Sequence, residues 1–275
     1  MGPLSVLVTR GDVVEAVHRV HASATDGRSF GDPRLTCFLR SSAKPIQAIP
    51  LVESYDDLAD EEIAIACASH QAEPEQLDAV RMLLARAGAT VDDLENGVQE
   101  GRPDGRLGHN CSGKHAGMLA ACRANGWPLD GYRLPDHPLQ RRIRELIGGD
   151  GSTAVDGCGV PTYALPLAEM ASFLTRTPAR VAAAMRARPD LVGGAGADDT
   201  DLMRELPGWI AKRGAEGLFC AAGPDGVGVA LKVEDGSSRA LRPALGHLLG
   251  IDRFREVPVS NSRGEIVGAL KIAPR

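Results

Sequence analysis

Segments with strand patterns lie at both ends of the chain, and segments with helical signals lie between them. The N-terminal strands form a hairpin that turns at Gly11-Asp12, and a second hairpin turns at Gly223-Pro224-Asp225-Gly226. The predicted strands are residues 4–9, 13–22, 218–222, 227–233 and 264–272. Strands first and last with a helical middle predict an α/β (α+β) fold, in which one antiparallel sheet is flanked by helices.

The helical segments are marked by proline near their first residue or glycine just after their last. The predicted helices are residues 74–87, 115–124, 137–147, 164–175, 178–188 and 238–249. Another helix is expected to begin near Ser41. Pro50 removes a backbone donor from its interior, so we expect this helix to kink or split.

Length and composition predict one large domain spanning residues 1–275. The chain is 43% hydrophobic but only 4% aromatic, so Ala, Val, Leu and Ile are expected to fill the core. The net charge of −5, with no basic stretch, argues against nucleic-acid binding and favours a small-molecule partner. The N-terminus lacks a secretory signal pattern and no apolar stretch reaches membrane-spanning length, which predicts a cytoplasmic protein without a membrane partner.

The chain has five lysines against twenty-six arginines, and three of the lysines stand in compact motifs. A lysine can be made neutral by burial, whereas arginine stays charged, so a retained lysine can serve as a base. Ser41 and Lys44 have the S-x-x-K spacing of serine acyl-transfer enzymes, in which the amine takes the hydroxyl proton. The alternative is that Ser41 only caps a helix and that Lys44 is a solvated first-turn residue.

Two further segments carry candidate groups. Ser69 and His70 lie in a run of small residues, where they are either packed residues or part of a substrate wall. Lys232 lies in a strand that is apolar on both sides, so its ammonium either extends to solvent at an edge or points into a polar site. A second lysine near Lys44 would favour a neutral amine, because two like charges at short range are costly.

Six irregularly spaced cysteines are reduced core residues, metal ligands or redox groups. His109, Cys111, His115 and the distant Cys158 are capable zinc ligands, although their spacing matches no common zinc-finger pattern. The glycines around them could instead permit tight turns near a ligand. Asp156 could orient a neighbouring base or ligand.

Six motifs of the chain form a combination: Arg-Ser-Ser-Ala-Lys-Pro (40–45), Ala-Ser-His (68–70), His-Asn-Cys-Ser-Gly-Lys-His-Ala-Gly-Met (109–118), Asp-Gly-Cys-Gly-Val-Pro (156–161), Asp-Thr-Asp-Leu-Met (199–203) and Ala-Leu-Lys (230–232). Together they resemble the Rhizobium etli inducible type of L-asparaginase, the class 3 asparaginases of the asparaginase II family. Their order and spacing run through essentially the whole chain.

The resemblance implies a fold like those of serine β-lactamases and glutaminases, a homodimer, and two Ser-Lys pairs facing one pocket. The implied pairs are Ser41 with Lys44 and Ser69 with Lys232. The family's metal position, usually zinc, falls on Cys111, Lys114 and Cys158, where the metal is expected to assist substrate binding more than the chemistry. Gln71-Ala72-Glu73-Pro74 and a shortened segment before His109 depart from the family pattern and bear on substrate identity.

The expected reaction is hydrolysis of L-asparagine by double displacement. Ser41 or Ser69, with Ser41 favoured, attacks the side-chain amide, ammonia leaves, and water hydrolyses the β-aspartyl ester. Arg40 is the candidate for the α-carboxylate, with His70 and Asp156 as further substrate-binding residues. Two alternatives stay open: a serine acyl-enzyme for glutamine, a β-lactam or a peptide, and a non-catalytic zinc or thiol sensor.

Overall fold

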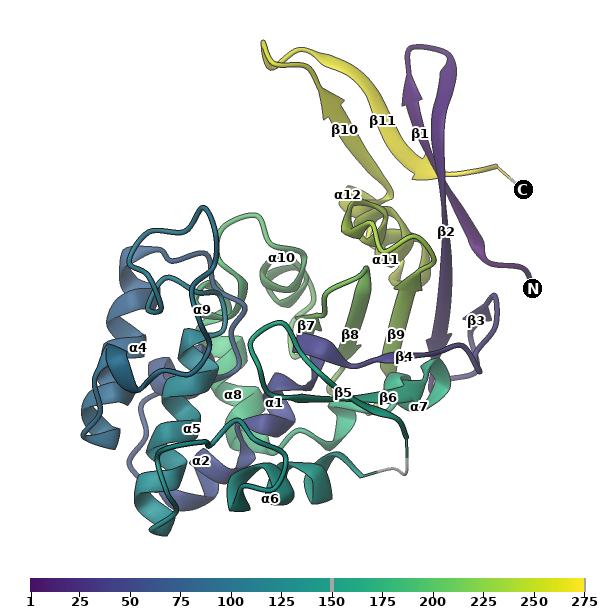
Figure 1. The fold of residues 1–275 in the computed structure, drawn as a ribbon. Helices are drawn as coiled ribbons and strands as arrows, with labels where there is room; N and C mark the ends of the chain where they lie inside the picture. Colours follow the sequence, from purple (N-terminus) through teal and green to yellow (C-terminus); the bar gives the residue numbers. More distant parts are fainter. Residues whose placement is uncertain (149–150, 275) are drawn as a thin grey trace.

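The computed structural model describes residues 1–148 and 151–274 and places most of the strands in one large sheet (Figure 1). In this sheet the strand order is β10-β11-β1-β2-β9-β8-β7, with β3 (Ser29–Phe30) paired to β2. Their ranges are β1 Leu4–Arg10, β2 Val13–Ala24, β7 Ile210–Arg213, β8 Leu218–Ala222, β9 Gly228–Val233, β10 Glu256–Ser260 and β11 Ile266–Ile272. Every pairing is antiparallel. The predicted α/β class with an antiparallel sheet and flanking helices is therefore confirmed.

The first and last strands are neighbours, because β1 pairs with β11 on one side and with β2 on the other. The hairpins β1–β2 and β10–β11 extend beyond the rest of the molecule, and both termini lie on this side (Figure 1). A separate three-stranded sheet has the order β4-β6-β5, formed by β4 (Thr36–Phe38), β5 (Thr153–Val155) and β6 (Pro161–Pro166). This small sheet leads the chain into the segment that carries Ser41.

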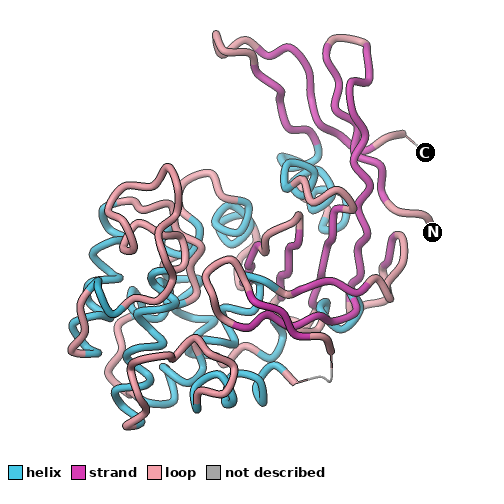
Figure 2. Tube along the Cα trace, viewed as in Figure 1, coloured by secondary structure: helices cyan, strands magenta, loops and turns pink. Residues whose placement is uncertain are grey.

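Most helices gather on the side of the molecule away from the projecting hairpins, as Figure 2 shows. They are α1 Lys44–Gln47, α2 Ile49–Ser54, α3 Asp60–Ala66, α4 Pro74–Ala87, α5 Ser112–Asn125, α6 Pro138–Ile147, α8 Ala179–Ala187, α9 Pro189–Gly193 and α10 Asp198–Glu205. Three others, α7 Leu167–Ala171, α11 Leu241–Leu249 and α12 Asp252–Arg255, pack against strands of the two sheets. Among the described residues, no helix is long and apolar enough to cross a membrane.

The helix boundaries follow local signals closely where those signals are strong. The helix α4 ends at Gly88, whose φ of +58° is a conformation that glycine adopts freely. The segment after Ser41 is split as expected: α1 ends at Gln47 and α2 begins at Ile49, which places Pro50 in the first turn of α2, where no donor is needed. The core consists mainly of Ala, Val, Leu and Ile, as the composition predicts.

One predicted helix is wrong. Residues 164–175 were expected to be helical, but β6 continues to Pro166 and is held between β4 and β5 by backbone pairing. Only Leu167–Ala171 forms an α-helix in this segment, followed by a 3₁₀ turn at Leu174–Arg176. Residues 164–166 pair with β4, more than a hundred residues away in the sequence, and these hydrogen bonds outweigh the local helical pattern.

Candidate active site

Ser69 lies just after α3 and is fixed by contacts to three other segments. Its backbone N–H donates to Val192 O at 2.9 Å, and its carbonyl oxygen accepts from Arg213 Nη2 at 3.1 Å. Lys44 Nζ lies 3.0 Å from Ser69 Oγ and also contacts the carbonyl oxygen of Ala68. Lys44 is fully buried at the start of α1, so this hydroxyl has a well-positioned amine beside it.

Ser41 lies in a 3₁₀ turn, Arg40–Ala43, between β4 and α1. Arg40, the residue before it, has a φ of +47°, a strained conformation for a residue with a side chain. The Ser41 hydroxyl has no hydrogen-bond partner among the residues that the structure describes, and the side chain is partly exposed. Ser41 and Ser69 line the same cavity, which has a volume of about 300 Å³.

The contacts between lysine amines and serine hydroxyls differ from the expected pairs, Ser41 with Lys44 and Ser69 with Lys232. Lys44 bonds to Ser69, and Lys232 does not reach either serine. The Lys232 ammonium donates to the carbonyl oxygens of Glu216 and Val233, both at 2.6 Å, because β9 directs this partly exposed side chain toward the turn between β7 and β8. Lys232 therefore supports the backbone of Glu216, a residue of the cavity wall.

The second buried lysine near the site is Lys212, which sequence reasoning missed. Its ammonium lies 3.1 Å from Asp199 Oδ2, and both side chains are completely buried between β7 and α10. Burial, together with the charge of Lys44, lowers the pKa of Lys212 to about 8 despite the opposing effect of Asp199. The sequence offered one signal that could have identified Lys212 as a candidate, because the chain has only five lysines.

Lys212 also connects to the segment of Ser41. The hydroxyl of Ser42 donates to the carbonyl oxygen of Lys212 at 3.0 Å, which ties the 3₁₀ turn to β7. Burial raises the pKa of Asp199, but the charges of Lys212 and Arg213 outweigh this effect and hold it below its usual value. The Asp199–Lys212 pair therefore forms a rigid polar support beneath the cavity.

Three predicted substrate-binding residues occupy positions around the cavity without lining it. Arg40 Nε donates to Asp156 Oδ1 at 2.5 Å, so these two residues bind each other. His70 is fully buried; its Nε2 bonds to Ser112 Oγ at 2.8 Å, and its Nδ1 accepts from the backbone N–H of Ala72 at 3.1 Å. The structure leaves His70 no free ring nitrogen for a substrate.

The predicted metal ligands come together in a buried cluster. Lys114 Nζ lies 2.9 Å from Cys158 Sγ, and Cys111 and Cys158 share a hydrogen bond that holds the pKa of Cys111 well below its usual range and raises that of Cys158. The pKa of Lys114 is raised, because the nearby Cys158 and Cys111 sulfurs outweigh the effect of burial. His115 Nδ1 bonds to Tyr132 OH at 2.7 Å, while its buried Nε2 has no hydrogen-bond partner among the described residues.

The donor set of this cluster fits zinc. Sulfur and neutral nitrogen are the ligands that zinc prefers, and His115, whose pKa burial lowers to about 4, is a further candidate donor. Among the described residues, this cluster included, no group of three His, Cys, Asp or Glu side chains is placed to hold a metal ion, so a zinc site here depends on Lys114 as a ligand. A lysine amine would have to lose its proton to bind the metal.

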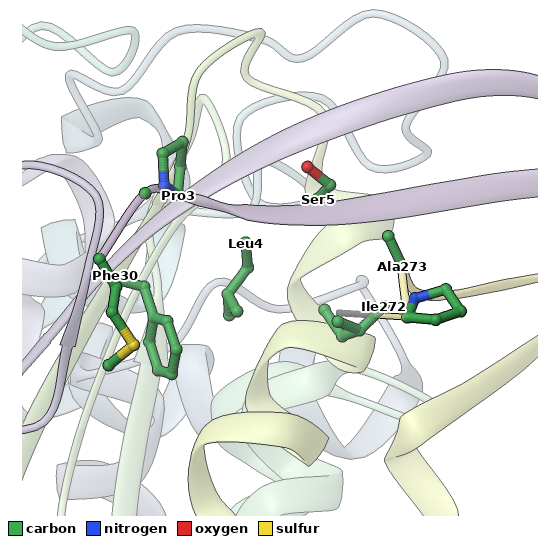
Figure 3. A pocket seen from close by; sticks show the side chains of 9 residues that line it. Pro3, Leu4, Ser5, Phe30, Ile272 and Ala273 are labelled. Carbon is green, nitrogen blue, oxygen red and sulfur yellow. The ribbon is translucent and has the colours of Figure 1, made fainter.

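Another cavity, of about 420 Å³, lies between the N-terminal segment and the end of β11 (Figure 3). Its wall is mostly apolar, with Leu4, Phe30 and Ile272 pointing toward it, and Ser5 is the one lining residue with a side-chain hydroxyl. It brings no base next to that hydroxyl. The smaller cavity of Ser41 and Ser69 is therefore the better candidate for chemistry.

A helix-flanked antiparallel sheet with a buried amine bonded to a serine hydroxyl is typical of serine-dependent acyl-transfer enzymes. The family model for L-asparaginase II matches residues 6–271, so the chain belongs to the L-asparaginase II family and is an amidohydrolase of the asparaginase type. No curated protein matches the sequence. One crystal structure, from Bacteroides dorei DSM 17855 and assigned provisionally to the beta-lactamases, is 13% identical, covers 84% of this chain and 85% of its own, and superposes with a TM-score of 0.34.

Proposed function

We propose that this protein hydrolyses the side-chain amide of L-asparagine to L-aspartate and ammonia through a serine acyl-enzyme. The observation that carries the proposal is the 3.0 Å contact between Lys44 Nζ and Ser69 Oγ at the edge of a cavity that Ser41 also lines. Membership of the asparaginase family supports amide hydrolysis as the reaction class. A volume of about 300 Å³ suits a substrate of the size of an amino acid.

Ser41 is the proposed nucleophile, because its hydroxyl is partly exposed and has no competing partner. Its oxygen attacks the amide carbon while its proton passes through the Ser69 hydroxyl to the Lys44 amine. Protonation by Lys44 lets ammonia leave and leaves a β-aspartyl ester on Ser41. Water then attacks this ester and gives a proton to Lys44, and that proton passes to the Ser41 oxygen as aspartate leaves.

Zinc is a proposed ligand of Cys111, Lys114 and Cys158. When bound, it would supply positive charge next to the Asp156–Arg40 pair and so assist substrate binding from outside the cavity lining. Without it, Lys114 and Cys158 retain their contact, and Asp156 holds Arg40 next to this cluster.

We also propose a homodimer, which light scattering of the purified protein tests directly.

The decisive experiment measures ammonia release from L-asparagine and L-glutamine, each against a blank, with zinc added or chelated. The wild type, Ser41→Ala and Ser69→Ala are compared, with Ser262→Ala, an exposed hairpin residue, as the matched control. Asparagine turnover that both cavity variants abolish supports the proposal, and mass spectrometry of the quenched enzyme identifies the acylated serine. Turnover of glutamine alone favours another amide, and absence of ammonia under all conditions favours the sensor alternative.

A further inference from the structure

Two charged side chains on the wall of the catalytic cavity lack a charged partner. Arg102 and Glu216 both line the cavity, and neither makes a side-chain hydrogen bond or ion pair among the described residues. Arg213, the other cavity arginine, is already bonded to the carbonyl oxygens of Ser69 and Gly193. The two unpaired groups carry opposite charges, and a ligand can satisfy both.

Arg102 approaches the cavity from the loop before α5. Its charge is close enough to His70, the neighbour of Ser69, to contribute to lowering the pKa of that imidazole, an effect due mainly to burial. Glu216 comes from a different segment, the turn between β7 and β8, where Lys232 holds its carbonyl oxygen. The two charges thus enter the cavity from separate elements.

The backbone at Glu216 gives independent support for a role of this side chain. Its φ is +59°, a left-handed conformation that glycine adopts at little cost and glutamate does not. The Glu216 carboxylate lies against Gly236, where an added Cβ would be 2.8 Å from Glu216 Oε2. Glu216, with its strained backbone, and Gly236 therefore lie against each other in the wall of the cavity.

We infer that Glu216 binds the α-ammonium group and Arg102 the α-carboxylate of a zwitterionic amino-acid amide. The inference rests on the proposed function, since it places that substrate in the cavity of Ser41 and Ser69. Arg40, the residue expected from the sequence to bind the carboxylate, already has Asp156 as its partner. The cavity therefore selects free amino acids by their two charged groups.

Three amides test each charge separately: L-asparagine, succinamate, which lacks the α-ammonium, and 3-aminopropanamide, which lacks the α-carboxylate. The kcat/KM of each is measured for the wild type, Glu216→Gln and Arg102→Gln. Arg263→Gln and Glu145→Gln remove the same charges from exposed sites and serve as matched controls. Thermal melting of every variant verifies folding.

Glu216→Gln is expected to lower kcat/KM for L-asparagine and 3-aminopropanamide by about 10- to 100-fold and to leave succinamate within about twofold. Arg102→Gln is expected to give the opposite pattern, with succinamate reduced and 3-aminopropanamide nearly unchanged. Equal losses on all three amides, or no loss on any, would overturn the inference. Failure of the wild type to release ammonia from any of them counts against the proposed function itself, which separates the two questions.

Discussion

The ammonium of Lys212 and the carboxylate of Asp199 form an ion pair that is completely shielded from water, 3.1 Å apart. The pair joins β7 to α10 and lies beneath the segment that carries Ser41. Removing one partner leaves the other charge buried without compensation, which costs more than the pair contributes.

Asp199→Asn is therefore expected to lower the free energy of unfolding by about 3–5 kcal/mol. Adding Lys212→Met removes the stranded charge and is expected to recover at least half of that loss. Urea unfolding of the two single variants and the double variant measures the coupling between the residues. A loss below about 1 kcal/mol in Asp199→Asn would show that water or another group replaces the carboxylate.

Lys44→Met is expected to reduce kcat/KM for the amide substrate on the order of 1,000-fold, because it removes the only amine bonded to a cavity hydroxyl among the described residues. Lys44→Arg is expected to be similarly inactive, since a guanidinium does not accept a proton. Ammonia release measures both. Lys271→Met, on the exposed side of β11, is the matched control, and activity retained in Lys44→Met would remove Lys44 from the mechanism.

The buried His70 predicts acid sensitivity. Burial lowers its pKa from 6.5 to about 3, so the folded state keeps it neutral while the unfolded chain takes up a proton below pH 6.5. Above pH 6.5 this titration does not affect the free energy of unfolding. As the pH falls toward 3 the free energy of unfolding decreases, and the decrease at pH 5 is about 2 kcal/mol. Urea unfolding at pH 7 and pH 5 measures the loss. The unfolding free energy of His70→Asn should change less between pH 7 and pH 5 than that of the wild type. An equal change in both proteins would contradict this explanation.

Cys158→Ser is expected to weaken zinc binding at least 100-fold, because it removes a sulfur that Lys114 also contacts. Metal content of the purified protein and competition with a zinc chelator give the affinity without reference to activity. Cys37→Ser, which alters a thiol on β4 far from this cluster in the sequence, controls for loss of a cysteine. Equal zinc affinity in both variants would rule out the proposed ligand set.

Glu216→Gly is expected to stabilise the protein by about 1 kcal/mol while lowering asparagine turnover, since glycine relieves the left-handed strain and removes the carboxylate. Glu145→Gly, in the interior of α6, should instead destabilise by about 1 kcal/mol. Thermal and urea unfolding compare the two. Destabilisation by Glu216→Gly would mean that the side chain supports the fold and not only the substrate.

Local signals predicted the fold where they act within a few residues. Proline at position 74 and glycine at position 88 define α4, and Pro50 accounts for the break between α1 and α2. The helix predicted for residues 164–175 was wrong because residues 164–166 pair with β4, which is distant in the sequence. Local sequence signals therefore predict where helices begin and end better than they predict which strands pair.

The same limit applies to the site. The motifs brought Ser41, Lys44 and Ser69 to one place, but the partner of Ser69 depends on how α1 packs against the end of α3. Lys212 and Lys232 both follow apolar residues in a strand, and only the position of α10 distinguishes the buried one. Arg102 and Glu216 lie in loops without a recognisable motif, so only the structure brings their charges together.

The distribution of lysines also has a practical consequence for handling the protein. Lys44, Lys114 and Lys212 are at most 3% exposed, and the partly exposed Lys232 is bonded to two carbonyl oxygens. Lys271 on β11 and the N-terminal Met1 are exposed on the sheet side of the molecule. Reagents that couple to amines should therefore attach a dye or a solid support mainly at the sheet. The protein could then be immobilised in one predominant orientation, with the cavity of Ser41 and Ser69 open to solution and the buried amines chemically untouched.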